Sequence, residues 1–229
     1  MDFFYQRKKI KNMNLRVNRN LEIVLSIPMR HPINKAKDFI VQKYGWIQRQ
    51  QIVLLKYVEE QETEVFNDGD LLYLLGEKYV IKLVKDKSNK VTVGEENVEI
   101  HIKERYFESK NYIKKTYEEW LKKFAIPIFG EQVQKYQLIM KNEKIIFPDV
   151  EVRKMRRRWG CCFPNVGKVV FNLNLIKVPM ECIEYVVIHE LAHFKYANHS
   201  RNFYDLVEKY MPEWKKRKMI LDKEYSVII

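Results

Sequence analysis

Long hydrophobic runs are missing from this chain of 229 residues. No stretch reaches the roughly 18 consecutive apolar residues that would indicate a membrane-spanning helix. The first seven residues also lack the charged-then-apolar layout of a secretory signal peptide. These two absences predict a cytoplasmic protein that has no membrane partner.

Cysteine is scarce, and its number is odd. The three cysteines are Cys161, Cys162 and Cys182, which argues against a disulfide-stapled scaffold and fits a reducing compartment. Cys161 and Cys162 are neighbours, so they cannot easily both bind one tetrahedral metal ion. We therefore expect that none of the three is a metal ligand.

Acidic residues are outnumbered by basic ones, which gives a formal net charge of +12. A positive excess is compatible with a nucleic-acid partner, but the lysines are spread along the whole chain, which favours an ordinary solvated surface. The exception is the dense run Arg153–Arg158, which allows a nucleic acid or a nucleotide as partner. No glycine-rich phosphate-binding loop accompanies this run.

Apolar periodicity predicts an α+β fold. We expect strands within residues 3–28, including a hairpin between residues 14–17 and 21–27, and then a helix over residues 33–60. Further strands are expected within residues 68–104 and a long helical stretch over residues 106–141, which Pro127 should kink or split. Strands are also expected near residues 145–152 and 169–174. The predicted organisation is a β-rich N-terminal lobe with one long helix, residues 1–104, followed by a second lobe, residues 105–229.

Histidine is rare, yet three of the five histidines fall between residues 189 and 199. His189, Glu190 and His193 form the pattern H-E-x-x-H within an apolar segment that begins after Pro179. Residues four apart share one face of a helix, so the two imidazoles can bind one zinc ion. Glu190, next to the first ligand, can reach a water on that ion and act as a general base.

His199 follows His193 by six residues and is the candidate third ligand, because a catalytic zinc site needs three protein ligands and one open position. We expect the helix to end at a left-handed Asn198 and Ser200 to cap a next helix over residues 201–210. Metzincins have the same spacing but place glycine where this chain has Tyr196, so the metzincin class is not supported.

Two alternatives concern the same histidines. The segment could be an ordinary core helix with two solvated histidines, although a polar His-Glu-His face inside an apolar helix needs a partner to be stable. His199 could be a histidine of a surface loop rather than a ligand.

The C-terminal half resembles the YgjP-like metallopeptidase family, which is related to the SprT and WLM zinc proteases. The resemblance rests on segments that occur in the family's order, and N-terminal segments extend it over nearly the whole chain. The segments are Arg153–Cys162, Asn172–Asn174, Glu184–His193, Asn198–Ser200 with Phe203, and Tyr210–Pro212. Two departures are Cys161, where the family usually has serine, and the additional basic residues Arg156 and Arg157.

This resemblance implies a zincin-like catalytic lobe, in which a metal-binding helix lies beside a small mixed sheet. It further implies zinc held by His189, His193 and His199, with Glu190 as the catalytic acid/base. Peptides or proteins are then the expected substrates.

Three further residues are candidates for contacting substrate or stabilising an oxyanion: Arg158, Tyr196 and Asn174. Arg158 could equally be a structural arginine packed on an aromatic ring. We also expect residues 169–174 to form a sheet edge with which an extended peptide can pair.

Two other functions stay open. Arg153–Arg158 could hold phosphates, which would make the protein a metal-dependent hydrolase of nucleotide phosphoanhydrides. A basic nucleic-acid-associated module with the same metal site is the third interpretation.

Overall fold

The computed structural model describes residues 3–18, 21–52 and 66–225. Contacts between Cα atoms divide the chain into two compact units, Met1–Glu64 and Val65–Ile229, and each unit has its own hydrophobic core. The sequence places the lobe boundary after residue 104. The strands between residues 71 and 103, however, contribute to the core of the C-terminal unit.

The N-terminal unit contains a three-stranded sheet with the order β1-β3-β2. β3 (Ile23–Pro28) pairs in parallel with β1 (Phe4–Lys8) and antiparallel with β2 (Asn14–Val17), so the predicted hairpin is confirmed. The sheet buries Ile23, Leu25 and Ile27 against the helical residues Ala36, Ile40 and Ile47.

The helical part of this unit is interrupted. α1 (Ile33–Gln42) ends at a turn at Lys43, and helical residues continue over 44–52. The rest of the predicted helix, residues 53–60, lies outside the described residues.

The C-terminal unit begins with a four-stranded sheet in the order β4-β5-β7-β6. Its strands are β4 (Leu71–Leu74), β5 (Glu77–Asp86), β6 (Lys90–Val93) and β7 (Asn97–Lys103). Buried and half-buried residues alternate along β7, which places Val98, Ile100 and Ile102 in the core. A short 3₁₀ helix, η1 (Glu104–Tyr106), leads out of the sheet.

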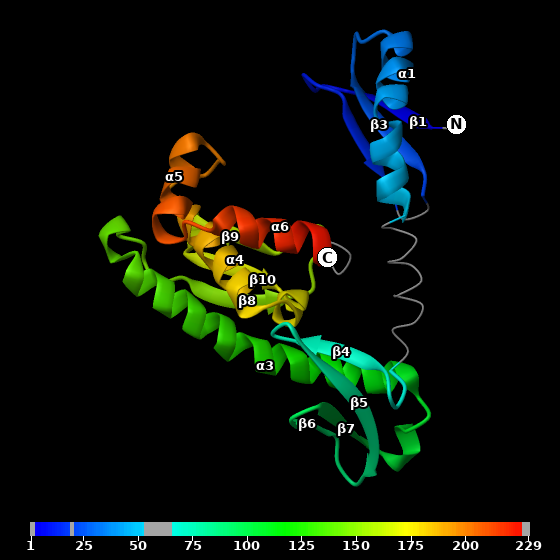
Figure 1. Ribbon diagram of the computed structural model, residues 1–229, viewed down its shortest axis with the longest axis vertical. Helices are drawn as coiled ribbons and strands as arrows, with labels where there is room; N and C mark the ends of the chain where they lie inside the picture. Colours follow the sequence, from blue (N-terminus) through cyan, green and yellow to red (C-terminus); the bar gives the residue numbers. More distant parts are fainter. Residues whose placement is uncertain (1–2, 19–20, 53–65, 226–229) are drawn as a thin grey trace. The chain divides into compact units, whose positions relative to one another are not determined.

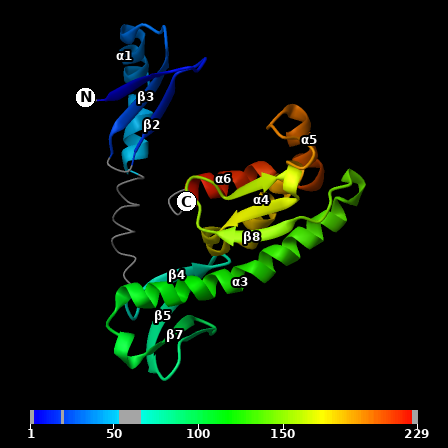
Figure 2. The ribbon, with the colours of Figure 1, turned by 180° about the vertical axis from the view of Figure 1, so that it is seen from behind.

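α3 (Lys110–Ile139) is one continuous helix that packs beside both sheets of this unit (Figures 1 and 2). Of the two predicted outcomes at Pro127, a kink or a split, the split is wrong, because the helix continues through this residue. Proline removes one N–H group from the helix ladder, and the buried neighbours Ala125 and Phe129 hold the helix against the core on either side. Among the described helices, none is long and apolar enough to cross a membrane.

The second sheet of this unit has the order β8-β10-β9. β10 (Lys168–Asn172) pairs in parallel with β8 (Asp149–Arg153) and antiparallel with β9 (Gly160–Phe163). The prediction that residues 169–174 form a sheet edge is therefore wrong, because β10 is paired on both sides. Three consecutive apolar residues of β10, Val169–Phe171, are almost fully buried, as a central strand allows. The edge next to the site is β9.

Short 3₁₀ segments connect these elements: η2 (Lys141–Glu143) follows α3, η3 (Pro164–Val166) separates β9 from β10, and η4 (Leu173–Lys177) follows β10.

Three helices complete the unit: α4 (Met180–Ala192), α5 (Arg201–Tyr210) and α6 (Trp214–Glu224). α4 starts directly after Pro179, as predicted, and contacts α3, α5, α6 and β9. The β4–β5 turn meets the start of α4 at Gly76, where an added Cβ would lie 2.9 Å from the Cα of Pro179. The whole unit is therefore an α+β assembly around α4.

Candidate metal centre

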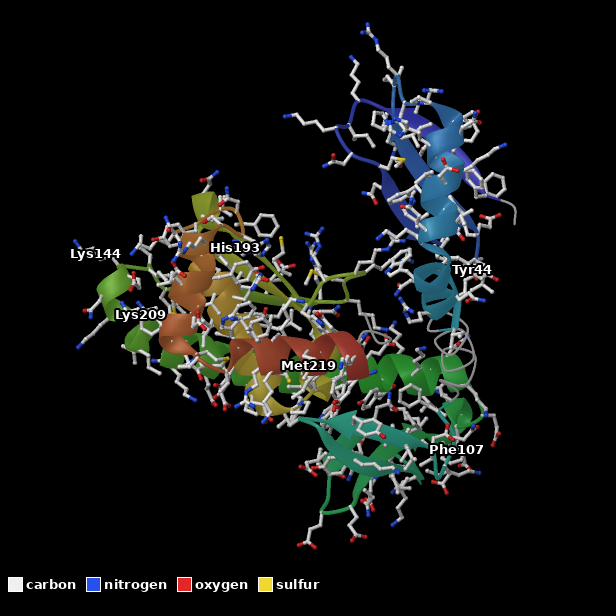
Figure 3. All side chains as sticks on the ribbon, turned by 45° about the horizontal axis from the view of Figure 1, so that its top comes forward. Tyr44, Phe107, Lys144, His193, Lys209 and Met219 are labelled. Atoms are coloured by element: carbon white, nitrogen blue, oxygen red, sulfur yellow. The ribbon has the colours of Figure 1, made fainter. Side chains whose placement is uncertain are left out.

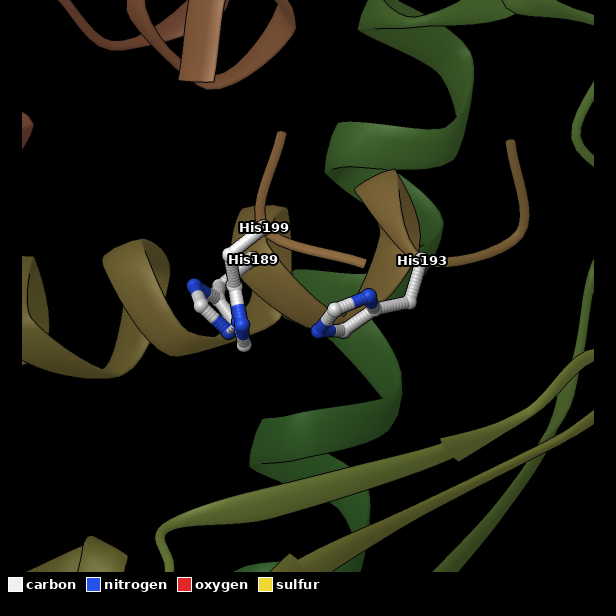
Figure 4. Close-up of side chains that lie close together, drawn as sticks. All are labelled: His189, His193 and His199. Atoms are coloured by element: carbon white, nitrogen blue, oxygen red, sulfur yellow. Dashed lines mark hydrogen bonds between the residues drawn. The ribbon is translucent and has the colours of Figure 1, made fainter. Parts of the chain in front are cut away.

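Three histidine rings converge at the C-terminal end of α4 (Figure 4). His189, His193 and His199 each offer one ring nitrogen, and these three atoms lie within 4.8 Å of one another. The Nε2 atoms of His189 and His199 are 2.9 Å apart. The structure thus brings together the three residues that the sequence predicted as ligands.

The local backbone explains how the third ring reaches the other two. Helical hydrogen bonds continue past α4 to Tyr196, and Ser200 N–H then donates to the carbonyl of Asn198 at 2.8 Å. This tight turn carries His199 back towards α4. The predicted left-handed conformation at Asn198 is wrong, because Asn198 is not among the described residues with positive φ. Ser200 caps α5 as expected, its Oγ accepting from Phe203 N–H.

The environment keeps two of these rings neutral. Burial lowers the pKa of His189 to about 3, with additional repulsion from the two neighbouring histidines, and burial also lowers the pKa of His193. Nδ1 of His193 faces the carbonyl of Tyr196 at 3.0 Å, so the proton sits on Nδ1 and Nε2 keeps its lone pair.

Phe203 of α5 supports all three rings from one side. Its ring centroid lies 4.9 Å from that of His189, 4.6 Å from that of His193 and 4.8 Å from that of His199. Because Phe203 is fully buried, this side of the triad excludes water.

These residues fit a zinc ion. Zinc binds imidazole nitrogen at about 2.0–2.1 Å, so two ligands of a tetrahedral ion lie roughly 3.3 Å apart. The 2.9 Å separation of the two Nε2 atoms and the 4.8 Å limit for the whole triad bracket this value. Imidazole nitrogens, shielded on one side by the buried Phe203, are donors that zinc prefers.

Glu190 is a buried carboxyl group beside the triad, with 5% of its surface exposed. Burial raises its pKa to about 8, while the charge of Arg158 and the backbone N–H of Cys162 act in the opposite direction. An added Cβ on Gly160 would lie 2.5 Å from Oε1 of Glu190. Only glycine at this position of β9 leaves room for the carboxylate.

A cavity of about 550 Å³ opens onto the triad. Its described lining residues include His189, Glu190, His193, His199 and Arg158. Of the three predicted substrate-contacting residues, Arg158 is therefore in the wall of the cavity. Neither Tyr196 nor Asn174 is among its described lining residues. Asn174 lies in η4, where its N–H donates to Asn172 Oδ1 at 3.1 Å.

The basic loop that carries Arg158 is held by Asn172, which is fully buried at the end of β10. Its Nδ2 donates to the carbonyls of Met155 and Arg158, at 3.0 Å each. Among the described residues, Arg158 forms no ion pair, and its guanidinium donates to Cys161 Sγ at 3.5 Å. Asn172 thus holds the backbone of the loop, while the guanidinium of Arg158 lies in the cavity wall.

Sequence reasoning did not identify the roles of Gly160, Asn172 and Phe203, although all three stand in the segments that resemble the YgjP-like family. One signal was available for Asn172: a polar residue directly after the buried apolar run of β10 needs hydrogen-bond partners. The close approach of Gly160 to Glu190 has no comparable local signal.

The comparison with family models identifies one family. A family model described as "YgjP-like, metallopeptidase domain" matches residues 11–224. Among solved structures, the metallopeptidase zymogen of Pyrococcus abyssi abylysin is similar, with 24% sequence identity and a TM-score of 0.38. That similarity covers 42% of this chain and 94% of the abylysin chain. No curated protein matches significantly.

Proposed function

This chain belongs to the YgjP-like metallopeptidase family, and we propose that it hydrolyses peptide bonds with a zinc ion held by His189, His193 and His199. One observation carries the proposal: three converging imidazoles share a cavity with a buried carboxyl group from the adjacent position of the same helix. Family membership, expected from the sequence motifs, supports the peptidase class.

A bound zinc ion supplies the Lewis acid that makes water nucleophilic near neutral pH. Burial raises the pKa of Glu190 to about 8, and a cation held by the three histidines would act in the opposite direction and favour the ionised carboxylate. Glu190 then accepts a proton from the attacking water and delivers it to the leaving amine. Gly160 and the N–H of Cys162 fix the position of this carboxylate.

We propose that an extended substrate binds along the free edge of β9. β9 pairs with β10 on one side, and its other edge has no strand partner among the described residues. The N–H of Cys162 reaches Glu190, which supports placing the reacting group on this side. A peptide that adds to β9 as a further strand would thus pass the site by β-augmentation.

Arg158 is the best supported of the three candidate substrate-contacting residues, because it lines the cavity and its charge acts on Glu190. We propose that its guanidinium assists in stabilising the oxyanion. The corresponding roles of Tyr196 and Asn174 stay predictions, and the carbonyl of Tyr196 instead orients His193.

The test combines metal analysis with turnover. We expect about one zinc per chain in protein purified without added metal, and far less in His199→Ala. We expect Glu190→Gln to keep zinc but lose at least roughly 100-fold in peptide hydrolysis, since it cannot move the proton. Full zinc content in His199→Ala would mean that the third ligand lies elsewhere.

A nucleotide is the second candidate substrate, and Arg158 favours it, because an arginine in the cavity wall can bind phosphate oxygens. Phosphate or pyrophosphate release from nucleoside triphosphates, abolished in Glu190→Gln, would support it. Peptide hydrolysis without any such release would reject it. The third interpretation, a nucleic-acid-associated module, would require salt-dependent DNA binding that survives Glu190→Gln.

A further inference from the structure

Glu143 is an acidic residue that the proposed mechanism does not use. It lies in η2, directly after α3, and only 6% of its side chain is exposed. Its carboxylate accepts hydrogen bonds from Lys195, from Lys209 Nζ at 2.8 Å and from Tyr210 Oη at 2.8 Å. Figure 3 shows Lys209 near Lys144, the neighbour of Glu143. One carboxylate thus joins three segments that are far apart in the chain.

The first of these segments is the turn after α4. Lys195 stands two residues after His193 and next to Tyr196, whose carbonyl fixes Nδ1 of His193. Holding Lys195 therefore restrains the turn that orients the His193 ring and sends the chain on to His199.

The second link runs to α5, which Glu143 holds at its C-terminal end through Lys209 and Tyr210. α5 carries Phe203, which packs against all three imidazole rings, and it starts two residues after His199. A shift of α5 relative to α4 would therefore move both the hydrophobic support and the third ring.

We infer that Glu143 is a positioning residue of the metal centre, which sets its metal affinity by tying the His193–His199 turn and α5 to the end of α3. This inference rests on the proposed function, because it concerns the same three histidines. It assigns Glu143 no contact with metal or substrate.

The charge state of Glu143 suits this role. Its hydrogen bonds to Lys195, Lys209 and Tyr210 lower its pKa to about 2, so it is an anion at any physiological pH. Hydrogen bonds between ionised partners are shorter and stronger than neutral ones, and they hold a defined geometry. A neutral amide at the same place would keep the shape but lose this strength.

The experiment measures zinc affinity by competition with a chromophoric chelator, on the full chain and well below the unfolding temperature. We expect Glu143→Gln to bind zinc about tenfold more weakly, the lower end of the effect of losing an outer-shell partner. The visible spectrum of the cobalt-loaded protein should also change, because the ligand geometry around the ion loosens.

Glu184→Gln is the matched control. Glu184 accepts a hydrogen bond from Lys135 at 2.5 Å and so links α4 to α3. Within the described part of the chain, it forms no hydrogen bond or ion pair with the turn after α4. We expect zinc affinity and the cobalt spectrum of this variant to equal those of the wild type. An equal loss of affinity in Glu184→Gln would attribute the effect to general loosening and overturn the inference.

Lys195→Met tests the route if Glu143→Gln does not fold, because Lys195 is 41% exposed at its side chain and tolerates replacement better. We expect it to weaken zinc binding, and the double variant to be no weaker than Glu143→Gln alone. Wild-type affinity in folded Glu143→Gln or Lys195→Met would overturn the inference while leaving the proposed function intact. Absence of zinc from the wild type would overturn both.

Discussion

At the scale of single residues, the site is built from buried polar side chains. The described residues include three buried polar or charged side chains, Ser26, Asn172 and Glu190. Glu190 lies beside the histidine triad, and Asn172 holds the loop that carries Arg158. A buried polar group costs free energy unless a partner compensates it. Asn172 has such partners in the loop backbone, whereas Glu190 has few and is kept there by the space beside Gly160.

Gly160→Ala should therefore disable the carboxylate without removing the metal ligands. The new Cβ would lie 2.5 Å from Oε1 and 2.7 Å from Cγ of Glu190, so the side chain must move. We expect peptide hydrolysis to fall by about 100-fold or more, the contribution of a positioned general base. The measurement is kcat on a peptide substrate, together with zinc content.

Gly130→Ala is the control for this substitution, because an added Cβ at this position of α3 has nothing within 4 Å. It should leave kcat unchanged and raise helix stability by up to about 1 kcal/mol. Unaltered hydrolysis by Gly160→Ala would show that Glu190 does not need its observed position.

Glu143 predicts a pH dependence of stability. Its folded pKa of about 2 lies below the ordinary value of 4.5, so the unfolded state binds the proton more readily. The stabilisation is fully present above pH 4.5 and is lost as the pH falls from there towards 2. At pH 7 we expect the free energy of unfolding of Glu143→Gln to be about 1–2 kcal/mol lower than that of the wild type. The loss is kept this small because both lysines are partly exposed, and solvent screens their charges.

Denaturant unfolding of both proteins without metal, from pH 7 to pH 3.5, measures this difference. The difference in unfolding free energy between the two proteins should become smaller below pH 4.5. A gap that stays constant over this range would show that the glutamate's charge does not contribute.

At the scale of secondary-structure elements, β10 supports the loop between β8 and β9 through one side chain. Asn172→Ala would leave the carbonyls of Met155 and Arg158 without their hydrogen-bond donor. We expect a loss of about 1–3 kcal/mol in unfolding free energy. The loosened loop should also be cut faster by trypsin after the exposed Arg156 and Arg157.

Asn165→Ala, in the exposed η3 segment, should change neither the unfolding free energy nor the rate of cleavage. If Asn172→Ala matched the wild type in both measurements, the loop would be held by other contacts.

At the scale of the whole molecule, the two separate cores predict that the C-terminal unit folds without residues 1–64. We expect a fragment of residues 65–229 to unfold cooperatively and to bind zinc like the full chain. A fragment of residues 105–229 should not fold. It lacks the buried apolar side chains of β4, β5 and β7, which are worth on the order of 10 kcal/mol, as much as a typical domain's stability.

Calorimetry and zinc titration of the two fragments test this division of the chain. A stable, zinc-binding fragment 105–229 would instead support the lobe boundary that the sequence suggests after residue 104.

Family membership and the convergence of three histidines could be anticipated from the sequence, because the relevant patterns are local. His189 and His193 share a helix face through their spacing, and Ser200 caps α5 through a bond to a residue three positions away. The pairing of β2 with β3 in a hairpin could be predicted from a turn signal between two short strand-like segments.

By itself, the sequence determined the α+β class, the position of α4 and the candidate ligands, because short-range spacing and propensity decide those features. Only the tertiary structure decided that β9 rather than β10 is the sheet edge, that Gly160 makes room for Glu190, and that Glu143 meets Lys195. These contacts join residues that lie far apart along the chain, and their formation depends on how whole elements pack. Local periodicity carries no information about that packing.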